Sequence, residues 1–267
     1  MIAIRCCEGF DELQACVRLQ IETWGMDASE IFPRKAFFLA QKIGGQVIGA
    51  FDLELPGASP SGGPESLIGF VYAWPGIQTD EGRSRPYLHS HMLAVRESYR
   101  NRGIGAQLKQ EQRHEALARG IRLMEWTFDP LEIKNAYLNL HKLGAIARHY
   151  EVNFYGASSS RLQGGLPTDR LVAEWQLDSP HVVAALEGRP APKSTIEERI
   201  VVPATIYEWK ATEAGRERAL AVQLANRAKF QVAFSRGLAV IGFTRDAEGN
   251  GIYELGILAQ SEKLQEC

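Results

Sequence analysis

The chain has 267 residues, of which 45% are hydrophobic and 23% charged, a composition typical of a soluble globular protein with a sizeable core. Thirty basic and 32 acidic residues give a formal net charge of -2, whereas a nucleic-acid-binding chain would carry a basic surplus or stripe. No run of about 18 apolar residues occurs, and residues 1–8 lack the pattern of a signal peptide. We therefore expect no nucleic-acid or membrane partner, and a cytoplasmic location.

The cysteines give no sign of a metal site. Cys6, Cys7, Cys16 and Cys267 include no Cys-x-x-Cys pair, and no histidine spacing completes a zinc site. We expect buried or incidental thiols in a reducing compartment and no bound metal.

The first part of the chain alternates strands and helices. Apolar periodicity predicts strands over residues 2–5, 46–53 and 67–74 and a helix over 11–24, with a second helix from Pro33 to the stop signal Gly44-Gly45. Two stretches rich in Pro, Gly and Ser, 56–64 and 75–86, read as irregular loops.

Strands and helices continue to alternate in the rest of the chain. Strands are predicted over 88–95, 123–128, 145–152, 171–177 and 198–202, with two more joined at Gly249-Asn250-Gly251. Helices are predicted over 106–119, from an Asp129 N-cap to Gly144, from Ser179 to Gly188 and over 213–234. This order indicates an α/β (α+β) fold with a mixed sheet and a C-terminal β-α-β-β extension.

The most informative segment lies between the strand at 88–95 and the helix that follows. Its residues are Arg100-Asn101-Arg102-Gly103-Ile104-Gly105. Glycines allow the backbone to approach an anion, and the unpaired N–H groups and dipole of a helix start attract one. We interpret the segment as a phosphate cradle. A nucleotide P-loop is excluded because Gly-x-x-x-x-Gly-Lys-Ser/Thr is absent, and the dinucleotide pattern Gly-x-Gly-x-x-Gly with its distal acidic residue is absent too.

Residues 95–105 closely resemble motif A of the GNAT superfamily, the GCN5-related N-acyltransferases. Asn135 and Lys142-Leu143-Gly144 resemble motif B, and the element order over residues 2–177 follows the fold of that family. The whole chain is similar to the longer bacterial members, with a GNAT domain at 1–178, an extension at 179–267 and a linker near 189–195.

The resemblance implies an acyl-coenzyme A donor, acetyl-CoA by default. The pyrophosphate would lie on N–H groups of the cradle, the pantetheine arm would pair with the main chain of the preceding strand, and Asn135 would touch that arm. A backbone N–H of the same strand would meet the oxyanion. The binding residues implied are Leu93, Ala94, Val95, Arg100, Asn101, Arg102, Gly103, Ile104, Gly105, Ala106 and Asn135.

An attacking amine must lose a proton, since an alkyl ammonium has a pKa near 10. His89 and His91 precede the cradle, and His89 stands where histone-type members of the family carry a glutamate base. An imidazole titrates in the useful range, so we expect one or both to act as base or relay; core hydrogen bonding is the alternative. Strand alternation would place residues 89, 91, 93 and 95 on one face.

The leaving thiolate has no obvious acid, because Leu140 stands where many family members have a tyrosine. Water could protonate a thiolate, since thiols are acidic. We therefore predict an acetyl-CoA-dependent N-acetyltransferase acting by direct attack of a small-molecule amine or amino acid, with a homodimer plausible. The alternatives are a non-catalytic acyl-CoA-binding or regulatory protein and an interaction module that binds no CoA. The residues leave the acceptor and the acyl chain open.

Overall fold

A computed structural model describes residues 1–56, 58–80, 82–190 and 194–258. The chain packs as two compact units, the first made of Met1–Met124 with Ser159–Arg161, the second of Glu125–Ser158 and the chain from Leu162. The middle of the predicted linker, 191–193, and Cys267 lie outside the described residues. The predicted family-domain boundary at 178/179 stays a prediction.

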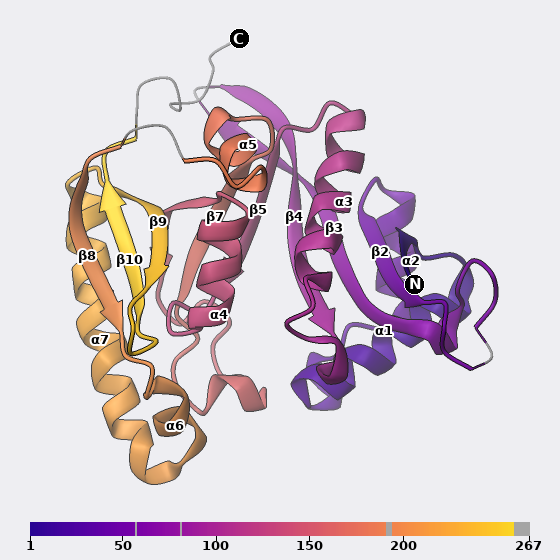
Figure 1. Cartoon of the computed structure of the whole chain (residues 1–267), viewed down its shortest axis with the longest axis horizontal. Coiled ribbons are helices and arrows are strands. Elements are labelled where there is room, and N and C mark those ends of the chain that lie inside the picture. Colours follow the sequence, from indigo (N-terminus) through magenta and orange to yellow (C-terminus); the bar gives the residue numbers. More distant parts are fainter. Residues whose placement is uncertain (57, 81, 191–193, 259–267) are drawn as a thin grey trace. The chain divides into compact units, whose positions relative to one another are not determined.

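Unit 1 holds an antiparallel sheet in the order β1-β2-β3-β4, flanked by three long helices (Figure 1). Its elements are β1 (Ile2–Cys6), α1 (Gly9–Trp24), η1 (Ala28–Glu30), α2 (Arg34–Lys42), β2 (Gln46–Asp52), η2 (Pro64–Ser66), β3 (Leu67–Asp80), β4 (Arg83–Val95), η3 (Glu97–Tyr99) and α3 (Ile104–Ala118).

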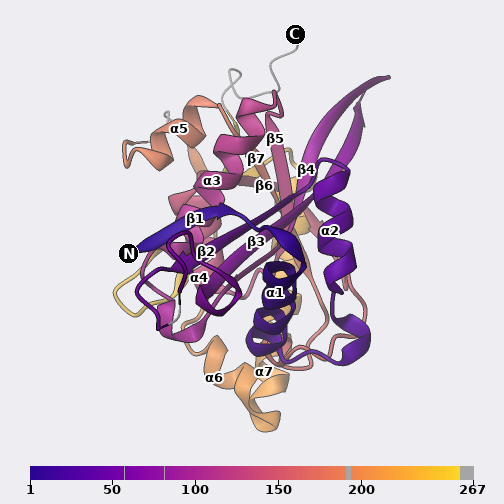
Figure 2. The same cartoon turned by 90° about the vertical axis from the view of Figure 1, so that its right-hand side faces the viewer.

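Both faces of this sheet are buried, so its strands are apolar throughout their central parts. On one face, Phe70 and Tyr72 pack with Leu13 of α1 and Phe37 of α2. On the other face, β2 and β3 pack against Ile104 and Leu108 of α3. Figure 2 shows the unit turned by 90°, with α1 and α2 near the viewer. The amphipathic helices thus fix which strand residues face which layer.

The predicted loop at 75–86 is wrong, because β3 and β4 continue as a long hairpin through most of it. Pairing runs from Pro75↔Leu88 to Asp80↔Arg83. Residues 75–86 of this hairpin lack the apolar alternation of a half-buried strand, because their side chains are exposed on both faces, up to 74% for Ile77. The segment also contains two prolines, which are typical of loops. Gly76 is needed where it stands, since a Cβ there would lie 2.4 Å from the Tyr87 ring.

Unit 2 has the strand order β5-β7-β6-β9-β10-β8. Its elements are β5 (Leu123–Phe128, beginning in unit 1), α4 (Ile133–Ala136), the π-helix η4 (Tyr137–Lys142), β6 (Ile146–Glu151), η5 (Arg161–Gln163, beginning in unit 1), β7 (Arg170–Gln176), α5 (Pro180–Leu186), β8 (Ile196–Val202), α6 (Ile206–Ala211), α7 (Glu213–Ser235), β9 (Ala239–Arg245) and β10 (Gly251–Gly256). The predicted α/β class with its C-terminal β-α-β-β segment is confirmed, with α6 as an addition. No helix within the described ranges is long and apolar enough to span a membrane.

Two of the cysteines meet in unit 1. The Sγ atoms of Cys7 and Cys16 are buried and 3.8 Å apart, whereas Cys6 is exposed. The contact with Cys16, together with burial, raises the pKa of Cys7 well above its ordinary value. Cys7 therefore stays a protonated and unreactive thiol at neutral pH.

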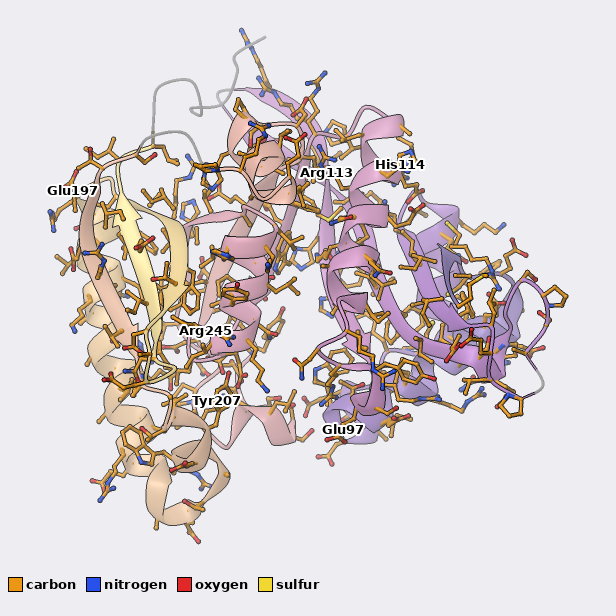
Figure 3. The ribbon with its side chains drawn as sticks, in the orientation of Figure 1. Glu97, Arg113, His114, Glu197, Tyr207 and Arg245 are labelled. Atoms are coloured by element: carbon orange, nitrogen blue, oxygen red, sulfur yellow. The ribbon has the colours of Figure 1, made fainter. Side chains whose placement is uncertain are left out.

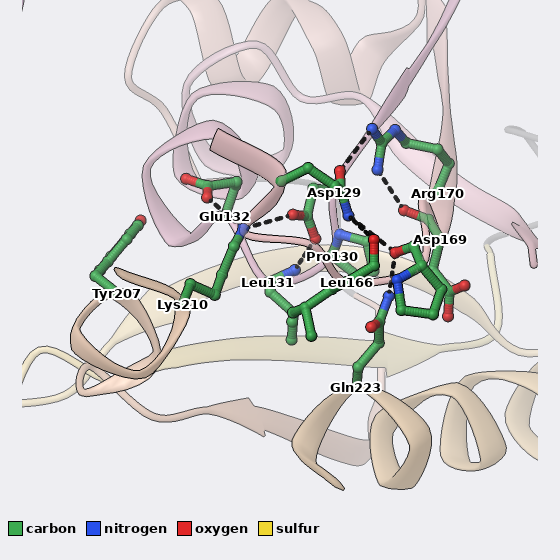
Figure 4. Close-up of polar contacts among 12 residues, drawn as sticks. Asp129, Pro130, Leu131, Glu132, Leu166, Asp169, Arg170, Tyr207, Lys210 and Gln223 are labelled. Atoms are coloured by element: carbon green, nitrogen blue, oxygen red, sulfur yellow. Dashed lines mark hydrogen bonds and ion pairs between the residues drawn. The ribbon is translucent and has the colours of Figure 1, made fainter. Parts of the chain in front are cut away.

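Asp129 does not cap the helix after β5, which corrects the sequence prediction. The helix begins one turn later, at Ile133. Asp129 instead forms a buried ion pair, because Lys210 Nζ of α6 donates to Asp129 Oδ2 at 2.8 Å and to Glu132 Oε1 at 2.9 Å (Figure 4). Leaving the buried Lys210 ammonium unpaired would cost far more free energy than losing a helix cap. The ion pair is therefore the interaction that Asp129 forms.

We predict that Lys210→Met destabilises unit 2 by about 3–5 kcal/mol, because Asp129 is left as an uncompensated buried charge. Urea unfolding followed by circular dichroism measures this loss. Lys134→Met is the matched control, since Lys134 is an exposed lysine of the same unit, and should change the free energy of unfolding by less than about 0.5 kcal/mol. Equal effects of the two substitutions would contradict the structural role of Lys210.

Candidate functional site

The segment between β4 and α3 has the geometry of an anion cradle. Gly103 occupies the N-cap position of α3 with φ 81°, and no side chain caps the helix there. The first helical bond runs from Gln107 N–H to the Gly103 carbonyl. The N–H groups of Ile104, Gly105 and Ala106 therefore precede the first bonded turn and point out of the helix start, where an anion is attracted.

Two residues of this turn have left-handed backbone conformations, Asn101 with φ 62° and Gly103 with φ 81°. The space next to Gly103 is open, because a Cβ there would meet nothing nearer than Gln107 Nε2 at 3.9 Å. The left-handed backbone conformation at position 103 is what favours glycine there, since the fold itself leaves room for a side chain. The open space is on the side from which a ligand would reach the backbone.

The two arginines of the turn are exposed but already have contacts. Arg100 Nε donates to the Val95 carbonyl at 3.1 Å. The Arg102 guanidinium lies 5.1 Å from the Tyr99 ring centroid, and Tyr99 donates its hydroxyl to Asp52 Oδ2 at 2.6 Å. That hydrogen bond is the main cause that lowers the pKa of Asp52 and raises that of Tyr99. The turn is therefore tied to the ends of β2 and β4.

A β-bulge in β4 overturns the predicted alternation of residues 89, 91, 93 and 95. Tyr72 pairs with Met92 but Ala73 pairs with Ser90, so His91 is the extra residue. An extra residue reverses the alternation beyond it. His91 consequently faces the α1/α2 layer, whereas Leu93 and Val95 face α3.

The structure does bring His89 and His91 together, with ring centroids 5.9 Å apart. Trp74 stacks on both, at 6.3 Å from His89 and 4.9 Å from His91, and Phe32 lies 4.8 Å from His91. His91 Nδ1 is buried without a hydrogen-bond partner. The aromatic rings of Trp74 and Phe32 thus lie around a His91 ring that has one unpaired polar atom.

Burial shifts both imidazoles toward the neutral form. It lowers the pKa of His91 to about 4, and it lowers the pKa of His89, helped by the charge of Lys109. Both rings are therefore unprotonated at neutral pH and can accept a proton, but they are weak bases. Both imidazoles are therefore weaker bases than an exposed imidazole would be.

A buried polar cluster lies behind the histidines, between β4 and α3. Lys109 Nζ donates to Ser90 Oγ at 2.7 Å, and Ser90 Oγ donates to Gln112 Oε1 at 3.0 Å. Burial lowers the pKa of Lys109 well below its ordinary value. The sequence analysis missed this cluster, although Lys109 and Gln112 occupy core spacing with Ile104, Leu108 and Ala116.

The motif B residues lie in unit 2. Asn135 is an exposed residue of α4, and Leu140, which replaces the usual tyrosine, is buried with 2% of its surface exposed. Gly144 ends the helical segment with φ 69°, and a Cβ there would lie 2.8 Å from Ala185. His114 is exposed and projects from α3 into solvent (Figure 3).

The sequence analysis assigned no role to one titratable group of unit 2, Glu125. Glu125 of β5 has its pKa raised to about 7, mainly by burial and then by Glu174, with Arg148 acting in the opposite direction. A carboxyl group on an apolar-flanked strand was the available signal. No cluster of three or more His, Cys, Asp and Glu side chains in the described ranges could hold a metal ion.

Comparison with known proteins agrees with this geometry. The family model described as the acetyltransferase (GNAT) family matches residues 7–145, slightly more than half of the chain. No curated protein matches the chain.

Three solved structures are similar to this chain at low sequence identity. NAA60 of Arabidopsis thaliana in complex with acetyl-CoA is 17% identical with a TM-score of 0.54, covering 67% of this chain and 100% of that one. The ribosomal-protein-S18-alanine N-acetyltransferase from Escherichia coli is 15% identical (TM-score 0.47, 67% and 96% covered). An N-acetyltransferase from Staphylococcus aureus Mu50 is 19% identical (TM-score 0.46, 67% and 99% covered).

The match to the family model, the shared fold and the uncapped glycine turn between β4 and α3 lead to one assignment: this chain belongs to the GNAT family of acetyltransferases.

Proposed function

We propose that the protein is an acetyl-CoA-dependent N-acetyltransferase. The observation that carries the proposal is the helix start at Ile104, whose N–H groups are uncapped and face the open space beside Gly103. A pyrophosphate fits this arrangement, because it is an anion that needs several N–H donors at close range. NAA60, which shares the fold, was solved with acetyl-CoA, and we propose the same donor here.

In this proposal the residues predicted from the sequence keep their roles. The pyrophosphate lies on the N–H groups from Asn101 to Ala106, near Arg100 and Arg102, and the pantetheine arm follows the main chain of Leu93, Ala94 and Val95. Asn135 contacts that arm. Residues 1–178 form the transferase domain, residues 179–267 shape the acceptor site or a homodimer interface, and the homodimer itself stays a prediction.

The reaction we propose is direct attack of an amine on the thioester. The C–N bond forms as the nitrogen adds to the acyl carbonyl, and the C–S bond breaks when the oxyanion collapses. An alkyl ammonium gives its first proton to solvent before it attacks, the nitrogen loses a second and more acidic proton after the attack, and water can protonate the leaving thiolate. Neutral imidazoles of low pKa suit this second transfer, and we propose His89, with His91 beside it, as the route.

Turnover tests the activity directly. The protein is mixed with acetyl-CoA and a panel of alkylamines, amino acids and arylamines, and free thiol is followed over time.

Leu140 favours a second function, a non-catalytic acyl-CoA-binding protein, because a buried leucine cannot protonate the thiolate. Tight CoA binding without thiol release for any amine would support that second function.

We predict that Gly103→Ala weakens CoA binding at least tenfold, because its Cβ enters the space in front of the cradle. Isothermal calorimetry with CoA measures the change. Gly120→Ala is the matched control: Gly120 follows the other end of α3, has φ 76° and also faces open space. Both substitutions carry the same left-handed strain of about 1–2 kcal/mol. Equal CoA affinities of the two variants would count against the cradle.

We predict that His89→Gln lowers kcat about 10- to 100-fold while the Kd for CoA stays within about twofold, because the imidazole handles a proton and not the coenzyme. Thiol release and calorimetry provide the two readouts. His114→Gln is the control, since His114 is an exposed histidine of α3. An unchanged kcat in His89→Gln would place the proton route elsewhere.

A further inference from the structure

The buried polar cluster between β4 and α3 holds Ser90, the residue that stands between the two histidines in the chain. Lys109 Nζ donates to Ser90 Oγ at 2.7 Å, and Ser90 Oγ donates to Gln112 Oε1 at 3.0 Å. Gln46 Nε2 of β2 donates to the Gln112 carbonyl at 3.0 Å. All four residues are at most 4% exposed. The cluster therefore ties the middle of β4 to one place on α3.

This cluster lies at the β-bulge of β4. Ser90 pairs with Ala73 and Met92 pairs with Tyr72, which leaves His91 as the extra residue. The pairing of β3 with β4 is regular on both sides of this point. The two flanking registers therefore require one extra residue in β4, but they do not decide which residue it is.

A bulge one residue earlier would satisfy the same two registers. Ser90 would then be the extra residue, His91 would pair with Ala73, and the His91 ring would turn to the α3 side of the sheet. His89 and Met92 would keep their present partners. The position of the bulge therefore decides whether His91 lies beside His89 or on the opposite face of the sheet.

The hydrogen bond between Lys109 and Ser90 excludes the earlier bulge. It holds the Ser90 hydroxyl on the α3 side, in register with Ala73, so the extra residue must come after Ser90. In the earlier bulge this hydroxyl would leave its position, and Lys109 would lose a buried hydrogen bond. Such a loss is costly where no water can replace the missing partner.

We propose that Lys109 and Ser90 are positioning residues, whose hydrogen bond fixes the bulge at His91 and so keeps both imidazoles on the face that packs against α1 and α2. This inference rests on the proposed function, in which the two imidazoles form the proton route. Lys109 and Ser90 meet on the α3 side of β4, away from the rings. Their effect on turnover therefore passes through His91.

A lysine selects one register more strictly than an apolar residue at the same position. A methionine at position 109 packs against residue 90 in either bulge, whereas a buried amine needs an oxygen within reach. Burial lowers the pKa of Lys109 well below its ordinary value, which favours the uncharged amine and reduces the cost of burying it. The cluster thus specifies register, as single buried polar residues do in coiled coils.

The earlier bulge would spare the rest of the site. Residues 92–95 pair with β3 in the same way in both positions of the bulge, and the glycine turn follows directly from them. The main chain that we expect to bind CoA is therefore unchanged, whereas the proton route loses His91. A displaced bulge consequently lowers kcat and leaves the affinity for CoA intact.

The test replaces the hydrogen-bonded pair with apolar side chains in the full chain, as Ser90→Ala/Lys109→Met. We expect kcat to fall about 10-fold while the Kd for CoA stays within about twofold. Ser84→Ala/Lys35→Met is the matched control, since it changes an exposed serine and an exposed lysine of the same unit, and it should match the wild type. Lys109→Met alone serves if the double variant does not fold, with a loss of kcat in the same direction.

Combining these substitutions with His91→Gln separates positioning from a general loss of stability. If the pair acts through His91, its removal adds no more than about twofold to the loss of kcat that His91→Gln causes alone. A general structural defect would multiply the two losses. Urea unfolding followed by circular dichroism shows that each variant is folded under the conditions of the assay.

Nuclear magnetic resonance gives a readout that needs no turnover. In the wild type, nuclear Overhauser effects should connect the His91 ring with the rings of Phe32 and Trp74, whose centroids lie 4.8 and 4.9 Å away. In Ser90→Ala/Lys109→Met we expect these effects to disappear and effects between His91 and α3 to replace them. The control variant should give the wild-type pattern.

The outcomes separate this inference from the proposed function. Unchanged Overhauser effects in Ser90→Ala/Lys109→Met, or losses of kcat that multiply with that of His91→Gln, would overturn the positioning role and leave the transferase standing. An unchanged kcat in His91→Gln would also overturn it, because no loss could then pass through that ring. A wild type that releases no thiol with any amine would overturn the proposed function and the positioning role with it.

Discussion

Everything proposed for this protein depends on a few backbone N–H groups that the fold leaves without an internal partner. At the start of α3, Gly103 turns the chain through a left-handed conformation, and no side chain folds back to satisfy the amides of the first turn. Unsatisfied donors at a helix start are costly in a buried place and useful in an open one. Because the space beside Gly103 is open, a ligand can supply the missing acceptors.

The elements around this turn keep it in position. Arg96 donates its N–H to the Ile68 carbonyl directly after β4 ends, and the Tyr99 hydroxyl is bonded to Asp52 of β2. α3 itself is held against the sheet by Ile104, the residue directly after Gly103, and by Leu108, one helical turn further along. The helix start cannot move away from the strand end without breaking these contacts, so the donors stay aimed at one place.

Features that depend on adjacent residues could be predicted from the sequence, whereas features that depend on residues far apart in the chain could not. Apolar periodicity predicted most strands and helices, and the glycine turn was recognisable because its function depends on adjacent residues. The bulge at His91 was not predictable, since one extra residue is defined only by the register of the partner strand. Asp129 was misread for the same reason, because its partner Lys210 lies 81 residues further along the chain.

The shifted pKa values follow the same rule, since each depends on packing that brings distant strands together. Sequence alone shows two histidines in a pattern and a glutamate on a strand, and ordinary pKa values would make the histidines the better bases. Burial reverses that order for His91 and Glu125. Desolvation weakens an imidazole because its charged form is the one penalised, and it strengthens a carboxylate for the same reason. Placing both types in poorly solvated surroundings therefore moves the His91 pKa to about 4 and the Glu125 pKa to about 7.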